Sequence, residues 1–151
     1  MRIAVCFFGI TRNFSKYTLG SIERYLCAEA ARHDPNFSRF AHFNQLAEVS
    51  SKRSRETSVP VDPNEFKLLN CNLASQTDQA EVDQRIDLEY LKQFGDNWND
   101  DFGSLKNLLR EFYSHNAVTE LLAQSQETFD VVIFSRVDVR YETPVMIPQV
   151  Q

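Results

Sequence analysis

The sequence predicts an α/β fold, a mostly parallel sheet with helices on both faces, on three observations. Two continuous apolar runs, residues 3–8 and 129–134, are typical of strands that are buried on both faces. Between them, residues 16–32 and 102–124 carry apolar side chains at helical spacing. Strand and helix patterns alternate, and right-handed crossovers then place the helices on both faces of the sheet. We expect a single α/β domain over residues 1–151.

The first half of the chain gives two strands and one helix. The run 3–8 ends at Gly9, where the chain turns toward the helix 16–32. The apolar stripe of that helix is Leu19, Ile22 and Leu26, and Asp34-Pro35 ends it. Residues 37–43 alternate in part and predict the second strand.

The second half is less regular until its last strand. Residues 48–63 are polar, with two prolines, and predict a mobile loop. Residues 65–69 predict a third strand, and residues 79–94 a loosely periodic helix with the stripe Val82, Ile86 and Tyr90. The clearest helix is 102–124, whose first apolar face is Leu105, Leu108, Leu109 and Phe112.

Composition narrows the function classes. The net charge of −5 speaks against a general nucleic-acid partner, although Lys52, Arg53 and Arg55 lie close together. No apolar run is long enough for a membrane span. Three cysteines at unrelated spacings indicate reduced thiols and a cytoplasmic protein. After the last strand the chain continues in an extended, proline-punctuated segment, and we expect a truncated, amino-terminal part of a longer enzyme.

Two polar clusters follow the first and last strands, at residues 9–13 and 135–140. Ligands of parallel sheets bind beyond the carboxyl ends of the strands, so neighbouring strands would bring these clusters into one crevice. Gly9 allows close approach of the backbone to an anion, and Arg12 offers a bidentate phosphate contact. Asp138 is placed to hold magnesium or manganese against a diphosphate, and Arg136 shares its strand face. The alternative is an internal Arg136–Asp138 ion pair that fixes the strand end.

The spacing of Cys6, Gly9 and Arg12 also fits the phosphate loop of a cysteine-dependent phosphatase. In that mechanism Cys6 is the nucleophile and Arg12 binds the phosphate. Bulky Phe7, Phe8 and Ile10 are unlike a tight phosphate loop, and Cys6 within an apolar run is typical of a buried small side chain. The phosphatase remains an alternative, as does a non-catalytic α/β binding module.

Several stretches resemble a family of glycosyltransferase-like proteins with the GT-A type nucleotide-sugar fold, of the bacterial and viral surface-polysaccharide type. They are "RIAVCFFGITRNF", "DPNEFKLLN", "GDNWNDDF", "GSLKNLLREFYSHNAV" and "FDVVIFSRVDVRY", in that order along most of the chain. The resemblance implies a Rossmann-like half that binds a nucleoside diphosphate sugar and transfers the sugar to an unknown acceptor.

The resemblance also implies roles for particular residues. Gly9 and Arg12 would lie near the nucleotide or its phosphates, and Arg136 and Asp138 at the metal-and-diphosphate motif. Where the fold usually has Asp-x-Asp, this chain has Asp138-Val139-Arg140, so Arg140 stands where it could replace the cation. Further candidates for the site are Thr11, His42 and Asn107, while Trp98 either stacks on a base or sugar or pins its loop to the core.

Overall fold

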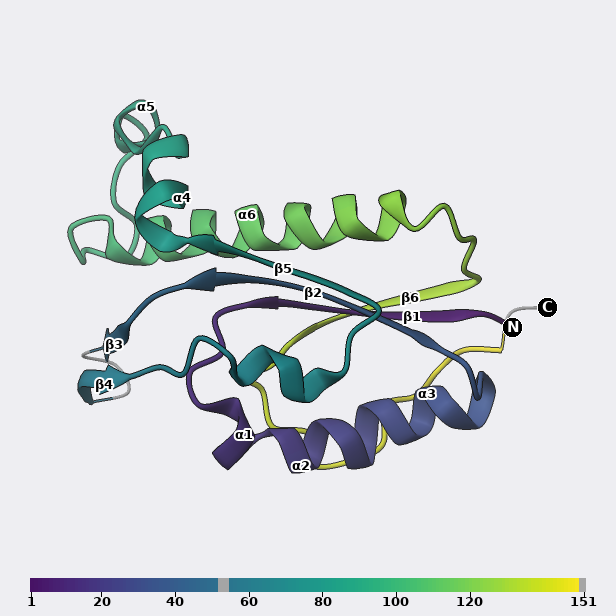
Figure 1. The fold of residues 1–151 in the computed structure, drawn as a ribbon. Coiled ribbons are helices and arrows are strands. Elements are labelled where there is room, and N and C mark those ends of the chain that lie inside the picture. Colours follow the sequence, from purple (N-terminus) through teal and green to yellow (C-terminus); the bar gives the residue numbers. More distant parts are fainter. Residues whose placement is uncertain (52–54, 150–151) are drawn as a thin grey trace.

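The computed structural model describes residues 1–51 and 55–149 and confirms the α/β fold (Figure 1). Four parallel strands form one sheet in the order β5-β2-β1-β6. Their bounds are Ile3–Gly9 (β1), Ser38–Gln45 (β2), Leu73–Asp78 (β5) and Val131–Arg136 (β6). The long helix α6 (Gly103–Gln124) lies on one face. A helical segment on the other face consists of α1 (Phe14–Tyr17), α2 (Leu19–Ser21), a π-helical turn (Ile22–Cys27) and α3 (Ala28–His33).

Strand β1 is central, which explains its unbroken apolar run. Side chains of a strand alternate between the two faces of its sheet. Ile3, Val5 and Phe7 pack in the core beneath the helical segment 14–33. Ala4 and Cys6 face the opposite way, into the core with Val118 of α6. Both faces of β1 are therefore covered, as the sequence predicts.

Strand β6 pairs with β1 but forms an edge of the sheet, and this corrects one prediction. The side chains of Val132 and Phe134 are more than a third exposed, so β6 is not buried on both faces. The predicted apolar face of α6 is also too wide, because Phe112 is 60% exposed. The helix covers β1 and β2 with its later turns, through Val118 and Leu121.

The predicted loop 48–63 contains two short strands instead. β3 (Glu48–Ser51) and β4 (Glu56–Pro60) pair in antiparallel fashion as a separate two-stranded sheet. The predicted basic cluster lies partly outside the described residues, because Lys52 and Arg53 fall in the interval 52–54. The pair of strands extends from the carboxyl end of β2, and β3 forms a wall of the cleft described below.

The third strand of the sheet lies at other residues than the sequence predicts. Residues Glu65–Leu69 form a 3₁₀ helix, and the strand is β5. Leu69 is buried in the core, which accounts for the apolar signal at 65–69. Glu65 is also buried, and its Oε1 accepts a hydrogen bond of 2.9 Å from the amide of Ser15. The 3₁₀ helix thus anchors the start of α1 rather than joining the sheet.

The region 79–94 is helical in two pieces, α4 (Gln79–Arg85) and α5 (Leu88–Lys92). The predicted stripe is broken because Ile86 is extended, and Val82 is buried while Tyr90 is exposed. After β6 the chain runs without helix or strand through residue 149 and packs on the helical segment, where Val145 N–H donates to Tyr25 O at 3.0 Å. In the described part of the chain, no helix has the length and apolarity needed to cross a membrane.

Candidate ligand cleft at the carboxyl ends of the strands

A cleft of about 1180 Å³ opens at the carboxyl ends of β1, β2 and β6. This is the position at which open parallel sheets bind ligands. The tip of β1 contributes Gly9 and Arg12, the end of β2 Asn44, and the end of β6 Arg136. The other walls come from β3, the loop before α6 and the first two turns of α6, with residues that include Glu48, Trp98, Asp100, Asp101, Ser104, Asn107, Arg110 and Glu111.

The turn after β1 has an unusual backbone that aims Arg12 at this cleft. Gly9 has a φ of +106°, a conformation that side-chain-bearing residues rarely adopt. Arg12 and Asn13 follow with φ of +48° and +58°, two left-handed residues in succession. Such backbone strain is concentrated at functional sites, where the surrounding structure maintains it. Thr11, between Gly9 and Arg12, is buried and does not line the cleft.

Arg12 and Arg136 converge on one carboxylate, Asp138. Arg136 Nη2 lies 2.6 Å from Asp138 Oδ2, and Arg12 Nη1 lies 3.7 Å from the same oxygen. Arg136 Nε also donates to Asp138 Oδ1 at 2.9 Å, which raises the pKa of Arg136. The internal Arg136–Asp138 ion pair predicted as an alternative is therefore present, and it lies at the wall of the same cleft.

Two further carboxylates hold these arginines in place. Glu56 of β4 pairs with Arg12, and Glu111 of α6 accepts a hydrogen bond from Arg136 Nη1 at 2.8 Å. The guanidiniums are thus held by carboxylates of β4, α6 and the segment after β6. Arg136 has five N–H donors, of which the contacts within residues 1–51 and 55–149 occupy three. Two donors of Arg136 are available for a ligand.

The donor set at Asp138 does not fit the predicted magnesium or manganese site. Both carboxylate oxygens of Asp138 accept hydrogen bonds from Arg136. Among the described residues, no group of three or more His, Cys, Asp or Glu side chains is placed to hold a metal ion. Arg140 is exposed and does not line the cleft, so it is not positioned as the substitute cation that the sequence predicts.

Asn107 lines the cleft, beside neighbours that the sequence pattern does not indicate. Asn107 Oδ1 accepts a hydrogen bond from Arg110 Nη1 at 2.9 Å, while Arg110 binds Asp83 through Nε and Nη2. Hydrogen bonds from Arg110 lower the pKa of Asp83. The backbone oxygen of Arg110 accepts from Asn44 Nδ2 at 2.8 Å, so α4, α6 and β2 meet at this wall.

His42 lies beneath the cleft and does not line it. It is 2% exposed, and burial lowers its pKa to about 4. Its Nδ1 lies 2.9 Å from Ser114 Oγ, and its Nε2 lies 3.0 Å from Thr77 Oγ1. Since the Ser114 hydroxyl donates to the His42 backbone oxygen, Nδ1 must carry the proton and donate to Ser114. Gly9 N–H also donates to Ser114 Oγ at 2.9 Å, so His42 fixes the strand ends rather than contacting a ligand.

Cys6 is buried and does not line the cleft, and the phosphatase alternative is therefore not supported. The residue is 0% exposed in the middle of β1, and burial raises the pKa of its thiol to about 12. A nucleophilic cysteine needs access to its substrate and a lowered pKa. Cys27 and Cys71 have thiol pKa values raised to about 12 by the same cause.

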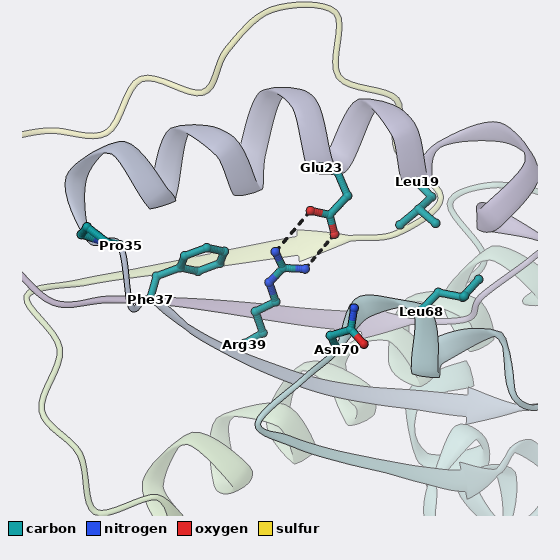
Figure 2. A pocket seen from close by; sticks show the side chains of 7 residues that line it. All are labelled: Leu19, Glu23, Pro35, Phe37, Arg39, Leu68 and Asn70. Atoms are coloured by element: carbon teal, nitrogen blue, oxygen red, sulfur yellow. Dashed lines mark hydrogen bonds and ion pairs between the residues drawn. The ribbon is translucent and has the colours of Figure 1, made fainter.

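A second hollow, of about 520 Å³, lies at the amino-terminal end of β2 (Figure 2). Figure 2 shows Arg39 across from Glu23, with Phe37 and Leu68 at the sides. The Arg39–Glu23 pair is bidentate, at 2.7 and 3.2 Å, and Arg39 also donates to Leu69 O. These groups satisfy one another at the end of the sheet opposite the cleft, so the larger cleft is the candidate ligand site.

Comparison with known proteins adds no assignment: no family model, curated protein or solved structure matches this chain.

Proposed function

We propose that the cleft binds a nucleoside diphosphate sugar and that the protein takes part in transfer of the sugar. The observation that carries this proposal is the convergence of Arg12 and Arg136 on Asp138 Oδ2, at 3.7 and 2.6 Å. Two guanidiniums that reach the same oxygen atom are close enough for one diphosphate to contact both. They come from neighbouring parallel strands, at the edge of the sheet where such ligands bind.

The chemistry of sugar transfer gives these arginines a defined role. The bond between the anomeric carbon and the phosphate oxygen breaks, and negative charge accumulates on the departing diphosphate. Preorganised cations stabilise this developing charge more effectively than mobile ones. Glu56 and Glu111 hold Arg12 and Arg136 in position before the ligand arrives. Because the donor set at Asp138 does not fit a metal, we propose that guanidiniums supply the neutralisation.

The alternative of a non-catalytic α/β binding module shares the binding step and lacks the transfer. The same cleft would then hold the nucleotide sugar without cleaving it. Release of the free sugar or its transfer to an added saccharide, followed by chromatography, separates the two.

Isothermal titration of the full chain with uridine and guanosine diphosphates, with and without manganese, tests the binding step. We expect one of the two to bind, and Arg136→Ala to weaken it at least tenfold, the lower range for a lost charge-assisted hydrogen bond. The matched control is Arg32→Ala, because Arg32 is an exposed arginine on α3. Equal binding by Arg136→Ala and the control, or binding only with manganese, would contradict the proposed role of Arg136.

A further inference from the structure

Trp98, the single tryptophan of the chain, lies at the cleft with its ring open to solvent. The residue is 54% exposed, so its large ring does not pin the loop to the core. An exposed aromatic ring at the wall of a polar cleft is a typical contact surface for a ring-shaped ligand. Trp98 therefore favours the stacking role over the packing role that the sequence left open.

The loop that presents Trp98 is held by hydrogen bonds within itself. Asp96 accepts hydrogen bonds from the amides of Trp98, Asp100 and Phe102, at 3.1, 2.9 and 3.1 Å. These amides lower the pKa of Asp96, with that of Phe102 contributing most. A loop that is ordered in advance loses less conformational freedom when a ligand binds.

Asn44 supplies an independent sign of a ligand at the same cleft. It is 2% exposed, and its Oδ1 has no hydrogen-bond donor in the described part of the chain. The orientation of the amide is fixed because Nδ2 donates to the Arg110 carbonyl. A buried acceptor without a donor is costly, and native proteins leave few of them. A hydroxyl group of a ligand would satisfy this oxygen.

The two ends of the cleft present different charged groups. Ser104 and Glu111 are seven residues apart on α6, which places these ends roughly 10 Å apart at 1.5 Å per residue. The Glu111 end carries Arg12 and Arg136, which are paired with Glu56, Glu111 and Asp138 and present guanidinium N–H donors. The Ser104 end carries Asp100 and Asp101, which repel a phosphate and accept hydrogen bonds from hydroxyl groups.

We propose that the Trp98 end of the cleft, the ring subsite, binds a neutral sugar ring. The apolar C–H face of the sugar stacks on the indole of Trp98, and its hydroxyl groups donate to carboxylate oxygens, including those of Asp101. The two carboxylates exclude a uronic acid. This inference rests on the proposed function only for the diphosphate at the arginine end, because a free saccharide carries the same recognised chemistry.

The fluorescence of the full chain reports the ring subsite directly, since excitation selective for tryptophan reaches Trp98 alone. The measurement is quenching by acrylamide, a neutral quencher, in the presence of saturating probe. The probes are uridine diphosphate, its glucose ester, its glucuronic acid ester and maltose. We expect the glucose ester and maltose to lower the quenching constant about twofold, because stacking covers one face of the indole ring. Uridine diphosphate alone and the glucuronic acid ester should leave it unchanged.

Each other outcome has a definite meaning. Equal protection by uridine diphosphate and its glucose ester would place the base on Trp98 and overturn the ring subsite, with the proposed function intact. Equal protection by the glucose and glucuronic acid esters would overturn the exclusion of acidic sugars. Protection by maltose without any nucleotide binding would overturn the proposed function and support the subsite. No protection by maltose or the glucose ester would overturn the subsite.

Variants separate the stacking role from stability. Trp98→Ala should weaken binding of the glucose ester, measured by calorimetry, at least fivefold while leaving uridine diphosphate within twofold, because only the sugar ring contacts the indole. Tyr17→Ala is the matched control, because Tyr17 is 64% exposed and does not line the cleft. Asp101→Asn should admit the glucuronic acid ester. Equal loss for both diphosphates in Trp98→Ala would overturn the subsite.

Discussion

Lowering the pH below about 6.5 should destabilise this fold through one buried side chain, His42. The ordinary pKa of histidine, 6.5, falls to about 4 in the folded protein because the ring is buried. The ring is held neutral, with Nδ1–H donating to Ser114 and Nε2 accepting from Thr77. A proton on Nε2 would remove that acceptor and place a charge on a ring to which no carboxylate within residues 1–51 and 55–149 makes a hydrogen bond.

The sign follows from proton uptake. Above about pH 6.5 both states are neutral at His42, and its contribution to stability is fully present. Between about pH 6.5 and 4 the unfolded chain binds a proton that the folded protein does not, so the free energy of unfolding falls as the pH falls. A pKa difference of this size corresponds to about 3 kcal/mol, taken as an upper value.

The assay is urea unfolding of the wild type and of His42→Gln across this pH range. Carboxylates titrate in both proteins, so the difference between the two curves isolates His42. We expect the wild type to lose about 3 kcal/mol more than the variant. Nuclear magnetic resonance titration of the His42 ring in the wild type gives its folded pKa even if the variant does not fold. Parallel stability curves, or a folded His42 pKa near 6.5, would refute this account.

Three further outcomes follow from the same contacts. Ser114→Ala should lower the unfolding free energy by about 2–4 kcal/mol, because it leaves buried partners on His42 and Gly9 without their hydrogen bond. Thr119→Ala, which removes an exposed hydroxyl of α6, should change it by under about 0.5 kcal/mol, and equal losses would contradict the network. Cys6 should resist iodoacetamide in the folded protein and react in urea, as mass spectrometry shows; rapid native labelling would contradict its burial. Asp96→Ala should lower the fluorescence anisotropy of the single tryptophan by loosening its loop, and an unchanged anisotropy would show that other contacts order it.

The sequence predicts best the strands that are buried on both faces of the sheet. The central strand β1 has an apolar run because both of its faces are covered. The edge strand β5 has the sequence "LASQTD", and its first two residues are exposed. Its sequence is therefore similar to that of a loop. The 3₁₀ helix Glu65–Leu69 was mistaken for that strand because Leu69 is a core residue. The apolar pattern of a sequence reflects which side chains are buried. At the edge of a sheet too few side chains are buried for this pattern to identify a strand.

The residues of the candidate site also fall into those that the sequence predicts and those that it does not. Gly9, Arg12 and Arg136 were predicted to share one crevice because the carboxyl ends of neighbouring parallel strands meet, and the structure places them at one cleft. Glu111 was missed, because its contact with Arg136 depends on how α6 is rotated over the sheet. Asn44 directly follows the predicted second strand, so the same strand-end rule would have found it. Its unpaired oxygen is visible only in three dimensions.

The sequence predicts two roles for Asp138, as an ion-pair partner of Arg136 and as part of a diphosphate site, and these two roles are compatible. As an ion-pair partner it holds Arg136 through both oxygens and draws Arg12 to within 3.7 Å. The same contacts set the spacing of two guanidiniums before a ligand is present. A diphosphate is a stronger and more extended acceptor than one carboxylate, and it can bind the remaining donors of Arg136 without removing Asp138. The ion pair is therefore compatible with the proposed ligand site, because Asp138 keeps together two cations that would otherwise repel each other.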